Sequence, residues 1–291
     1  MIPEARRVLI IGGNSAIARH LLALLPEARA VARTGSHPRV TSVGDYRDLR
    51  ADSFDGVEAV INCAGVVRGT EAELHAVNVE LQVALAKAAR DAGAVRYVSI
   101  GSFSIFGERS RIGPETPEAP IDAYGRSKRD GDRALHRLQT DRFGILSVAF
   151  PAIIGTTRAG KVERMLRLWH RTGIWPMPAE DIARSMIGAE AAARTLAHAA
   201  GDDRTGRVLA ADPIAFSYRT VAQWLREDVG GRFGLFAVPR QGISLLRRAS
   251  PSLYRSTMAD SMLEPMCNYM IERGLESSLR HELAAAVVRR Q

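Results

Sequence analysis

A tyrosine and a lysine four residues apart, Tyr124 and Lys128, are the residues of this sequence best suited to proton transfer. On a helix, residues at this spacing lie on one face, so the ammonium group lies near the phenol. A nearby cation favours the phenolate and lowers the pKa of a tyrosine, which makes it a usable acid or base near neutral pH. The chain has only three lysines beside 37 arginines. A lysine four residues after a tyrosine is therefore seldom expected by chance. The alternative is an ordinary surface helix.

A glycine-containing turn near the N-terminus predicts a phosphate-binding element. The apolar strand Arg7–Ile11 precedes the turn, and an apolar helix follows it to about Leu25. A strand, a small-residue turn and a helix cradle a phosphate with backbone N–H groups and the helix N-terminus. A plain strand–turn–helix is the alternative. The predicted cofactor contacts of this turn are Gly12, Gly13, Ser15, Ala16 and Ile17.

The next predicted strand, Arg29–Arg33, ends beside the expected position of an adenosine ribose. An acidic residue there would accept from a ribose 2′-hydroxyl, whereas an arginine suits a 2′-phosphate. The sequence offers Arg33 and no acid before Asp45. This pattern favours NADP over NAD, with a solvated loop arginine as the alternative.

Strands and helices alternate from residue 7 to residue 150, which predicts a doubly wound parallel sheet. Small residues follow the strand Val57–Cys63 and would let the backbone lie against a flat cofactor. Ser102 follows the strand Val95–Ile100. Ligands bind at the carboxyl ends of such strands, so Ser102 is placed to hold a substrate oxygen. Its alternative is a turn serine satisfied by the backbone.

The second half of the sequence has a different character. Residues 161–172 and 180–200 are predicted to be helical, 208–211 to form a brief strand, and 217–228 to form a helix capped by Ser217. Residues 230–291 are predicted to be loop and helix. The sequence therefore predicts a Rossmann-like dinucleotide-binding domain over residues 1–160. Residues 161–291 would supply the remaining sheet elements and a smaller, mostly helical substrate-binding lobe.

The composition of the chain limits the kinds of partner and the compartment that we expect for this protein. The net charge of +8 is dispersed along the chain, which favours a phosphate-bearing small molecule over nucleic acid. The histidines are scattered, so no metal site is expected. Two cysteines make no disulfide framework, and no apolar signal core or stretch of about 18 apolar residues occurs, which together predict a cytoplasmic protein. The basic, amphipathic segment 243–255 is interpreted as a solvated helix face rather than a membrane contact.

The sequence resembles the extended short-chain dehydrogenase/reductase family, which includes nucleotide-sugar epimerases, dehydratases and 4-keto-reductases. The order and spacing of the matching segments agree over about residues 7–155, and the second half matches only loosely. The matching segments are the turn at Gly12–Ala18, Asp45, Asn62–Gly65, Asn78-Val79, Ser102 before Ile105–Gly107, Glu115, Tyr124-x-x-Ser127-Lys128 and Pro151-Ala152.

The resemblance implies roles for these residues. Tyr124 would exchange a proton with the substrate oxygen, Lys128 would hold the nicotinamide ribose, and Ser102 would position the substrate. Asp45 would reach the adenine amino group and Asn78 would help to order the site. Further cofactor contacts are expected at Tyr46, Cys63, Ala64, Gly65 and Pro151, and further substrate contacts at Phe103, Ser104 and Arg184.

One departure from the family pattern narrows the chemistry. Dehydratases of the family place an Asp-Glu pair directly after the catalytic Ser or Thr, because eliminating water needs an additional acid and base. Here those positions are Phe103 and Ser104, which disfavours dehydration. We therefore expect an NADPH-dependent reductase of a nucleotide-linked 4-keto sugar. The alternatives are an NAD-dependent 4-epimerase, a reductase of a non-sugar carbonyl, and a non-catalytic cofactor sensor. The resemblance also implies a possible homodimer.

Overall fold

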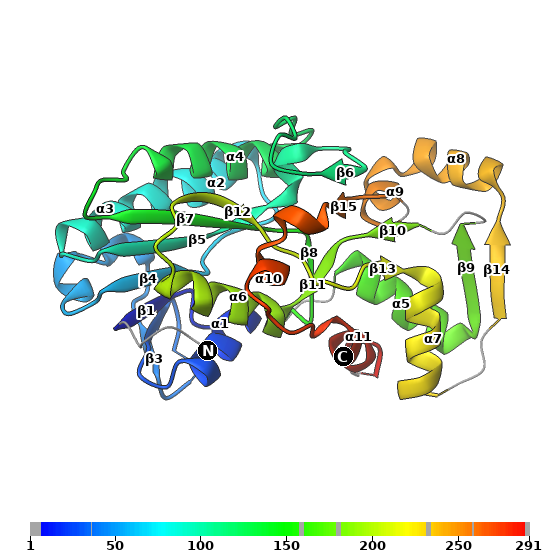
Figure 1. Ribbon diagram of the computed structural model, residues 1–291, viewed down its shortest axis with the longest axis horizontal. Coiled ribbons are helices and arrows are strands. Elements are labelled where there is room, and N and C mark those ends of the chain that lie inside the picture. The colour runs from blue at the N-terminus through cyan, green and yellow to red at the C-terminus, as the bar shows by residue number, and fades with distance from the viewer. Residues whose placement is uncertain are drawn as a thin grey trace. The chain divides into compact units, whose positions relative to one another are not determined.

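The computed structural model describes residues 7–35, 37–156, 160–178, 182–230, 234–257 and 259–288 (Figure 1). Residues 1–6 and the predicted helix start at residues 180–181 lie outside the described residues, as do parts of segment 230–291. The chain divides into two compact units whose segments interleave. The first unit comprises Met1–Gly107, Pro117–Pro151 and Ala192–Ala210; the second comprises Glu108–Thr116, Ala152–Ala191 and Ala211–Gln291. Where the sequence predicted one boundary near residue 160, the chain crosses between the units several times.

A seven-stranded, wholly parallel sheet forms the centre of the first unit, in the order β12-β7-β5-β4-β1-β2-β3. This confirms the predicted Rossmann-like doubly wound fold. Its strands are β1 (Val8–Ile11), β2 (Arg29–Ala32), β3 (Val40–Ser42), β4 (Ala59–Asn62), β5 (Arg96–Ser102), β7 (Gly144–Phe150) and β12 (Gly206–Leu209). Its helices are α1 (Ala16–Leu24), α2 (Glu71–His75), α3 (Gln82–Asp91), α4 (Ala123–His136) and α6 (Ala189–Gly201), the last of which begins in the second unit.

The central strands are apolar on both faces because helices cover both faces of the sheet. Helices α2, α3 and α4 lie over one face, and α1 and α6 over the other (Figure 1). On the first face, Leu9, Val60 and Tyr97 of three neighbouring strands pack with Leu85 of α3 and Leu135 of α4 in one buried cluster. Helices therefore occupy both faces, and the loops at the carboxyl ends of the parallel strands are left to bind ligands.

The second unit is built from helices and four two-stranded sheets. Strand β10 pairs with β13 antiparallel, whereas β11 with β8, β14 with β9, and β15 with β6 pair parallel. The strands are β6 (Arg111–Ile112), β8 (Ala152–Ile154), β9 (Ile174–Pro178), β10 (Ala183–Arg184), β11 (Met186–Gly188), β13 (Phe216–Ser217), β14 (Gly234–Val238) and β15 (Met262–Leu263). The helices are α5 (Lys161–Thr172), α7 (Tyr218–Asp228), α8 (Arg240–Ala249), α9 (Pro251–Thr257), α10 (Tyr269–Glu272) and α11 (Leu279–Val288).

The prediction of a helix over residues 180–200 is wrong for its first part. Helix α6 begins at Ala189, and the residues before it form β10 and β11. Strand β10 pairs with β13 and β11 with β8, so partners distant in sequence override the local pattern. The prediction of loop and helix throughout residues 230–291 is also wrong at β14 and β15, which are strands. Helix α7 and its cap Ser217 are confirmed. No helix among the described residues is long and apolar enough to cross a membrane.

Candidate active site

Helix α4 carries Tyr124 and Lys128 and begins where the sequence predicts. Asp122 caps it, because its carboxylate accepts from the N–H of Gly125 at 2.7 Å. Gly125 is needed for a close approach, since a side chain there would begin 2.6 Å from the carbonyl oxygen of Ser104. The first turn of α4 therefore lies directly against the segment that follows β5. This contact brings Tyr124 toward Ser102.

Ser102 ends β5, and its hydroxyl lies near enough to the phenol of Tyr124 to lower the pKa of that phenol. The Ser102 hydroxyl also donates to Oγ of Ser104 at 3.1 Å and accepts from its N–H at 3.2 Å. Phe103 is buried in the 3₁₀ turn that follows Ser102. The structure thus brings together Ser102, Tyr124 and Ser104 at the carboxyl end of the sheet.

The electrostatics of the pair differ from the expectation. Burial raises the pKa of Tyr124, and the nearby Asp122 raises it further, while the nearby Ser102 hydroxyl opposes them. The expected lowering of the tyrosine pKa is therefore wrong, because removing the phenol from water outweighs the groups that favour the phenolate. Burial lowers the pKa of Lys128 to about 8, and the charge of Asp132 partly opposes this. Lys128 is only 8% exposed.

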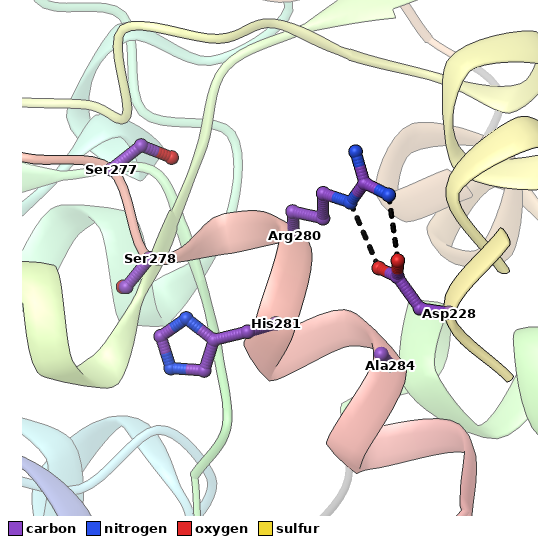
Figure 2. A pocket seen from close by; sticks show the side chains of 6 residues that line it. All are labelled: Asp228, Ser277, Ser278, Arg280, His281 and Ala284. Carbon is purple, nitrogen blue, oxygen red and sulfur yellow. Dashed lines mark hydrogen bonds and ion pairs between the residues drawn. The ribbon is translucent and has the colours of Figure 1, made fainter.

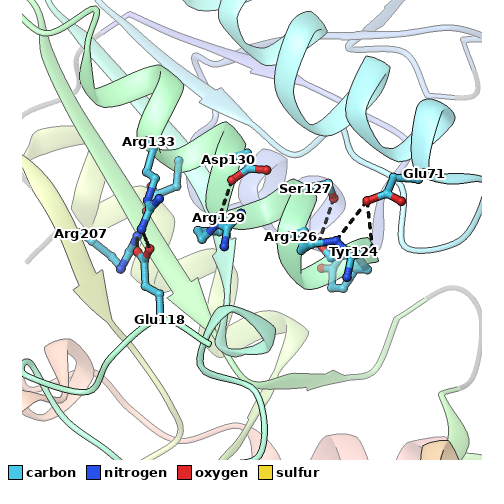
Figure 3. Close-up of polar contacts among 10 residues, drawn as sticks. Glu71, Glu118, Tyr124, Arg126, Ser127, Arg129, Asp130, Arg133 and Arg207 are labelled. Carbon is cyan, nitrogen blue, oxygen red and sulfur yellow. Dashed lines mark hydrogen bonds and ion pairs between the residues drawn. The ribbon is translucent and has the colours of Figure 1, made fainter. Parts of the chain in front are cut away.

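A buried carboxylate, Asp132, lies one turn beyond Lys128 on α4. It accepts from Nε of Arg207 in β12 at 2.6 Å and pairs with His136 at 3.2 Å. Arg207 and Arg133 also converge on Glu118 (Figure 3). Burial acts to raise the pKa of Asp132, but its contact with His136 and the charge of Arg207 outweigh it, so the pKa is lowered. The network ties α4 to the edge of the sheet.

The sequence analysis missed this network. The available signal was the spacing: Asp132 follows Lys128 by the same four residues that separate Lys128 from Tyr124, so all three share one face of α4. A charged residue on a face that is otherwise committed to the core predicts a buried partner. The identity of that partner, Arg207, could not be predicted, because it lies 75 residues away.

Asn78 joins three segments around the pair. Its side chain accepts from the N–H of Val66 at 3.1 Å, donates to the carbonyl of Val66 at 2.8 Å, and donates to Oγ of Ser127 at 3.0 Å. Ser127 in turn donates to the carbonyl of Tyr124 at 2.8 Å (Figure 3). Asn78 lies in a π-helical turn, Ala76–Leu81, between α2 and α3. Such turns are frequent at functional sites because they redirect side chains and carbonyls.

The glycine turn lies at the point where the strand order reverses, between β1 and β4. Gly12 has φ +87°, and a side chain there would begin 2.7 Å from the backbone nitrogen of Ala64, which follows β4. The N–H groups of Gly12 and Gly13 both donate to the carbonyl of Val31. The donors that face an anion are therefore those of the first turn of α1, at Ala16 and Ile17, which have no partner within the helix.

The side chain of Ser15 is the N-cap of α1 and accepts from the N–H of Ala18 at 3.1 Å. It also forms a hydrogen bond with Cys63, whose pKa burial raises to about 12. Cys63 is therefore a neutral thiol near physiological pH, not a nucleophile. The Ser15 hydroxyl thus closes the turn against β4. Gly65, the next small residue beyond Ala64, is exposed.

Arg33 is exposed just past the end of β2. Its carbonyl accepts from Oγ of Ser42 and from the N–H of Gly44, which holds the backbone in place. Burial raises the pKa of Tyr46, and the N–H and charge of Arg33 oppose this. Asp45 accepts from the N–H of Arg47 and pairs with its guanidinium at 3.3 Å. The predicted residues Arg33, Asp45 and Tyr46 therefore lie close together on the surface.

The sequence model that represents the NAD-dependent epimerase/dehydratase family matches residues 8–199 of this chain. The chain belongs to this family. It is accordingly an enzyme of the extended short-chain dehydrogenase/reductase type. No curated protein matches the chain closely in sequence.

Solved structures share the fold of this family member at low sequence identity. UDP-N-acetylglucosamine 4-epimerase from Bacillus cereus has a TM-score of 0.77 at 13% identity, covering 97% of this chain and 96% of that one. MoeE5 in complex with UDP-glucose and NAD has a TM-score of 0.72 at 18% identity, with 97% of each chain covered. RMD from Pseudomonas aeruginosa complexed with NADPH has a TM-score of 0.68 at 13% identity, covering 97% and 98%.

Two of the predicted site residues, Pro151 and Arg184, follow α4 in the sequence and lie outside it. Pro151 separates β7 from β8 and is half-buried. Arg184 belongs to the second unit, on β10, where it is buried and donates to the carbonyl of Arg255 at 3.3 Å. Burial lowers its pKa. Within its own unit, Arg184 is therefore a buried cation held by a backbone carbonyl.

The second unit of this family member also contains a hollow of about 490 Å³ that none of the predicted site residues lines. Its walls are Asp228, Ser277, Ser278, Arg280, His281 and Ala284 (Figure 2). The start of α11 faces Asp212, whose carboxylate already accepts from the N–H groups of Ser278 and Leu279. Arg280 is held by Asp228 in a two-bond pair. Both features that attract an anion are thus satisfied within the protein.

Proposed function

We propose that this protein is an NAD(P)-dependent oxidoreductase that reduces the 4-keto group of a nucleotide-linked sugar, with NADPH as the cofactor. The observation that carries the proposal is the proximity of the Ser102 hydroxyl to the phenol of Tyr124, with Lys128 one turn along α4. A hydroxyl and a phenol at the end of a parallel strand are suited to hold a carbonyl oxygen and exchange a proton with it.

The residues around the glycine turn fit a dinucleotide. The contact of Gly12 with Ala64 leaves no room for a side chain, and the first turn of α1 presents N–H groups beside it. These groups would hold the diphosphate, and Lys128 would hold the nicotinamide ribose. When bound, the cofactor supplies or removes the hydride. Every other requirement, from orientation to proton transfer, falls to the protein.

Tyr124 is proposed to donate the proton that the substrate oxygen needs as it becomes a hydroxyl. Burial keeps the phenol protonated until that step, which suits an acid in a reduction. The Ser102 hydroxyl would donate to the same oxygen and fix its position. In the reverse direction, Tyr124 would accept the proton, and a charged Lys128 would stabilise the phenolate.

The segment after Ser102 supports reduction over dehydration. Elimination of water needs a further acid and base beside the substrate. Phe103 is buried and apolar, and Ser104 shares its hydrogen bonds with Ser102. Tyr124 is thus left as the main proton-transfer group on this segment and α4. This limits the proposed chemistry to oxidation–reduction or epimerisation.

The second candidate is an NAD-dependent nucleotide-sugar 4-epimerase, and the family membership favours it. The UDP-N-acetylglucosamine 4-epimerase fold matches this chain over nearly its whole length. What supports the reductase is Arg33, exposed at the end of β2 where a 2′-phosphate would lie and where a ribose-binding acid is lacking. A reductase of a non-sugar carbonyl and a cofactor sensor stay as the remaining alternatives.

The deciding experiment measures NADPH oxidation by the purified protein with a nucleotide-linked 4-keto sugar. We expect Arg33→Ala to raise KM for NADPH by about 10-fold or more without changing KM for NADH, because a charge-assisted bond is lost. Arg142→Ala, an exposed arginine elsewhere in the first unit, is the matched control. Protein that purifies with stoichiometric NAD and does not oxidise NADPH is the epimerase instead. A cellular role that survives Tyr124→Phe would identify a sensor.

A further inference from the structure

The outer face of the β9–β14 sheet in the second unit is apolar. In its register, Gly234 pairs with Ile174, Phe236 with Pro176 and Val238 with Pro178. Alternate residues of a strand share a face, so these six residues form one face of the sheet. Ile174 is 54% exposed and Phe236 is 56% exposed. A solvated sheet face normally carries polar side chains, and this one carries none.

On β9, the opposite face of the same sheet is anchored in the core. Trp175 and Met177 of β9 are buried in the main apolar cluster of the second unit. Trp169 of α5 packs against Trp175, with ring centroids 5.5 Å apart. On β14, Leu235 is 37% exposed and Ala237 is also exposed, so this strand is open to solvent on both faces. Strand β9 therefore anchors the sheet, and β14 with Ile174 presents apolar side chains to solvent.

The apolar face continues onto helix α8. Val238 touches the first turn of α8, because a side chain at Gly242 would begin 2.9 Å from its Cγ1. Ile243 and Leu246 turn inward and pack on the same core cluster as β9. Leu245 is 68% exposed, and the exposed Arg248 follows it by three residues on the outward side of the helix.

The charge of this region has one sign. From Val229 to Ala259 the sequence contains five arginines and neither aspartate nor glutamate. Arg247 and Arg248 are exposed on α8, beside Leu245. Exposed apolar side chains among arginines are the composition of segments that lie in a membrane interface and bind anionic lipid headgroups.

We propose that the second unit binds the surface of a membrane that contains anionic lipids, although the sequence alone favours a solvated helix face for segment 243–255. The binding surface, here called the β14–α8 surface, consists of Ile174, Phe236, Val238, Leu245, Arg247 and Arg248. The apolar side chains would enter the headgroup boundary and the two arginines would contact lipid phosphates. Since no described helix can cross a bilayer, the attachment is peripheral and reversible.

A second copy of the chain is a poorer occupant of this surface. A two-fold symmetric contact places the same patch on both partners. It would bring Arg247 and Arg248 of one copy against those of the other, with no acidic residue in the segment to pair with them. Like charges facing one another disfavour such a contact, whereas a layer of phosphates satisfies it.

The test is sedimentation of the full-length protein with vesicles of phosphatidylcholine alone or with phosphatidylglycerol. We expect binding only to the vesicles with phosphatidylglycerol, weakening as salt rises. Arg247→Glu with Arg248→Glu should reduce the partition coefficient at least 25-fold, at about fivefold for each arginine lost. Arg137→Glu with Arg142→Glu, two exposed arginines of the first unit, changes the net charge equally and should leave binding intact.

A second variant pair tests the apolar half of the surface. Phe236→Ser with Leu245→Ser should lower binding, whereas Met266→Ser, at a residue 90% exposed in the second unit, should not. Equal binding to both kinds of vesicle, or no binding to either, would overturn the proposal. So would unchanged binding of both double variants of the β14–α8 surface, the one at Arg247 and Arg248 and the one at Phe236 and Leu245. So would a dimer, detected by light scattering, that Phe236→Ser with Leu245→Ser dissociates, because a second copy would then cover the surface.

Discussion

Replacing Lys128 by methionine should stabilise the protein near neutral pH while abolishing its proposed activity. Lys128 is 8% exposed, and burial lowers its pKa from 10.5 to about 8, against the opposing charge of Asp132. At about 1.4 kcal/mol per pH unit, this difference corresponds to about 3 kcal/mol of folding free energy lost by burying the charged form. Methionine has a similar length and no charge, so Lys128→Met should recover most of that energy.

The pH dependence follows from the direction of the shift. Between pH 8 and 10.5 the unfolded chain holds the lysine proton and the folded chain releases it, so this contribution to stability rises with pH. Below about pH 8 the lysine is charged in both states and the full penalty is present. Lys128→Met should therefore be more stable than the wild type by about 3 kcal/mol at pH 7. Above about pH 10.5 the difference should vanish.

Urea unfolding of the two proteins across this pH range measures the effect. The thiol of Cys63 also titrates abnormally, because burial raises its pKa to about 12. Comparing wild type and variant at each pH cancels that contribution, since Cys63 is common to both. Lys87→Met, at an exposed lysine on α3, is the matched control and should show no pH-dependent difference. If Lys128→Met is less stable than the wild type at pH 7, the lysine is not a buried charge and the reasoning fails.

Three further predictions test the supports of the site. Gly12→Ala should destabilise the fold by about 2 kcal/mol or more and weaken cofactor binding, because φ is +87° and the new Cβ meets backbone; urea unfolding and NADPH titration measure both. Asn78→Leu should cost about 2–3 kcal/mol by stranding the backbone groups of Val66, and unchanged stability would contradict the bonds described. Asp132→Asn should cost about 2 kcal/mol at pH 7 by weakening the bond to Arg207. Because the pKa of this carboxyl is lowered, wild-type stability should fall below about pH 4, and the variant should show less of that fall.

The sequence was sufficient to predict the first unit because its signals are local. The strand-to-helix alternation from residue 7 to 150 depends on apolar runs and punctuating glycines, and the parallel sheet has the predicted strands. The Tyr124–Lys128 spacing placed both residues on one face of α4. The glycine turn predicted a strand, a turn and a helix, and β1 and α1 flank the turn as expected. The close contact of Gly12 with Ala64 was not predicted.

The second unit was harder to predict because its pairings are distant. Strand β9 has the sequence Ile-Trp-Pro-Met-Pro, and two prolines disguise a strand because they cannot donate to a partner. Its partner β14 begins 60 residues after it at Gly234, so no local pattern announces the pair. The short strands β10 and β11 were missed because an alanine-rich helix follows them directly. The helix was therefore predicted over the whole of residues 180–200.

The pKa of Tyr124 could not be predicted because it depends on burial. Spacing alone places a cation near the phenol and predicts a lowered value. Packing of α4 against the segment after β5 leaves Tyr124 half-buried, and this burial has the largest effect on the pKa of its phenol. The sign of a pKa shift is therefore a property of the packed structure, and a sequence motif predicts only which groups will meet.

Three features that break ordinary folding rules lie at the carboxyl end of the sheet in the first unit. A buried lysine lowers stability, a π-helical turn interrupts the α2–α3 segment at Asn78, and Gly12 adopts a positive φ beside Ala64. Each feature has an alternative that would cost less folding stability: methionine in place of Lys128, a regular helical turn at Asn78, or a wider loop at Gly12. A fold selected for stability alone would use those alternatives, whereas a site that must hold a charged group and a flat ligand cannot. Because Lys128→Met removes one of these costs without disturbing the other two, it can show whether the lysine is retained for chemistry and not for folding.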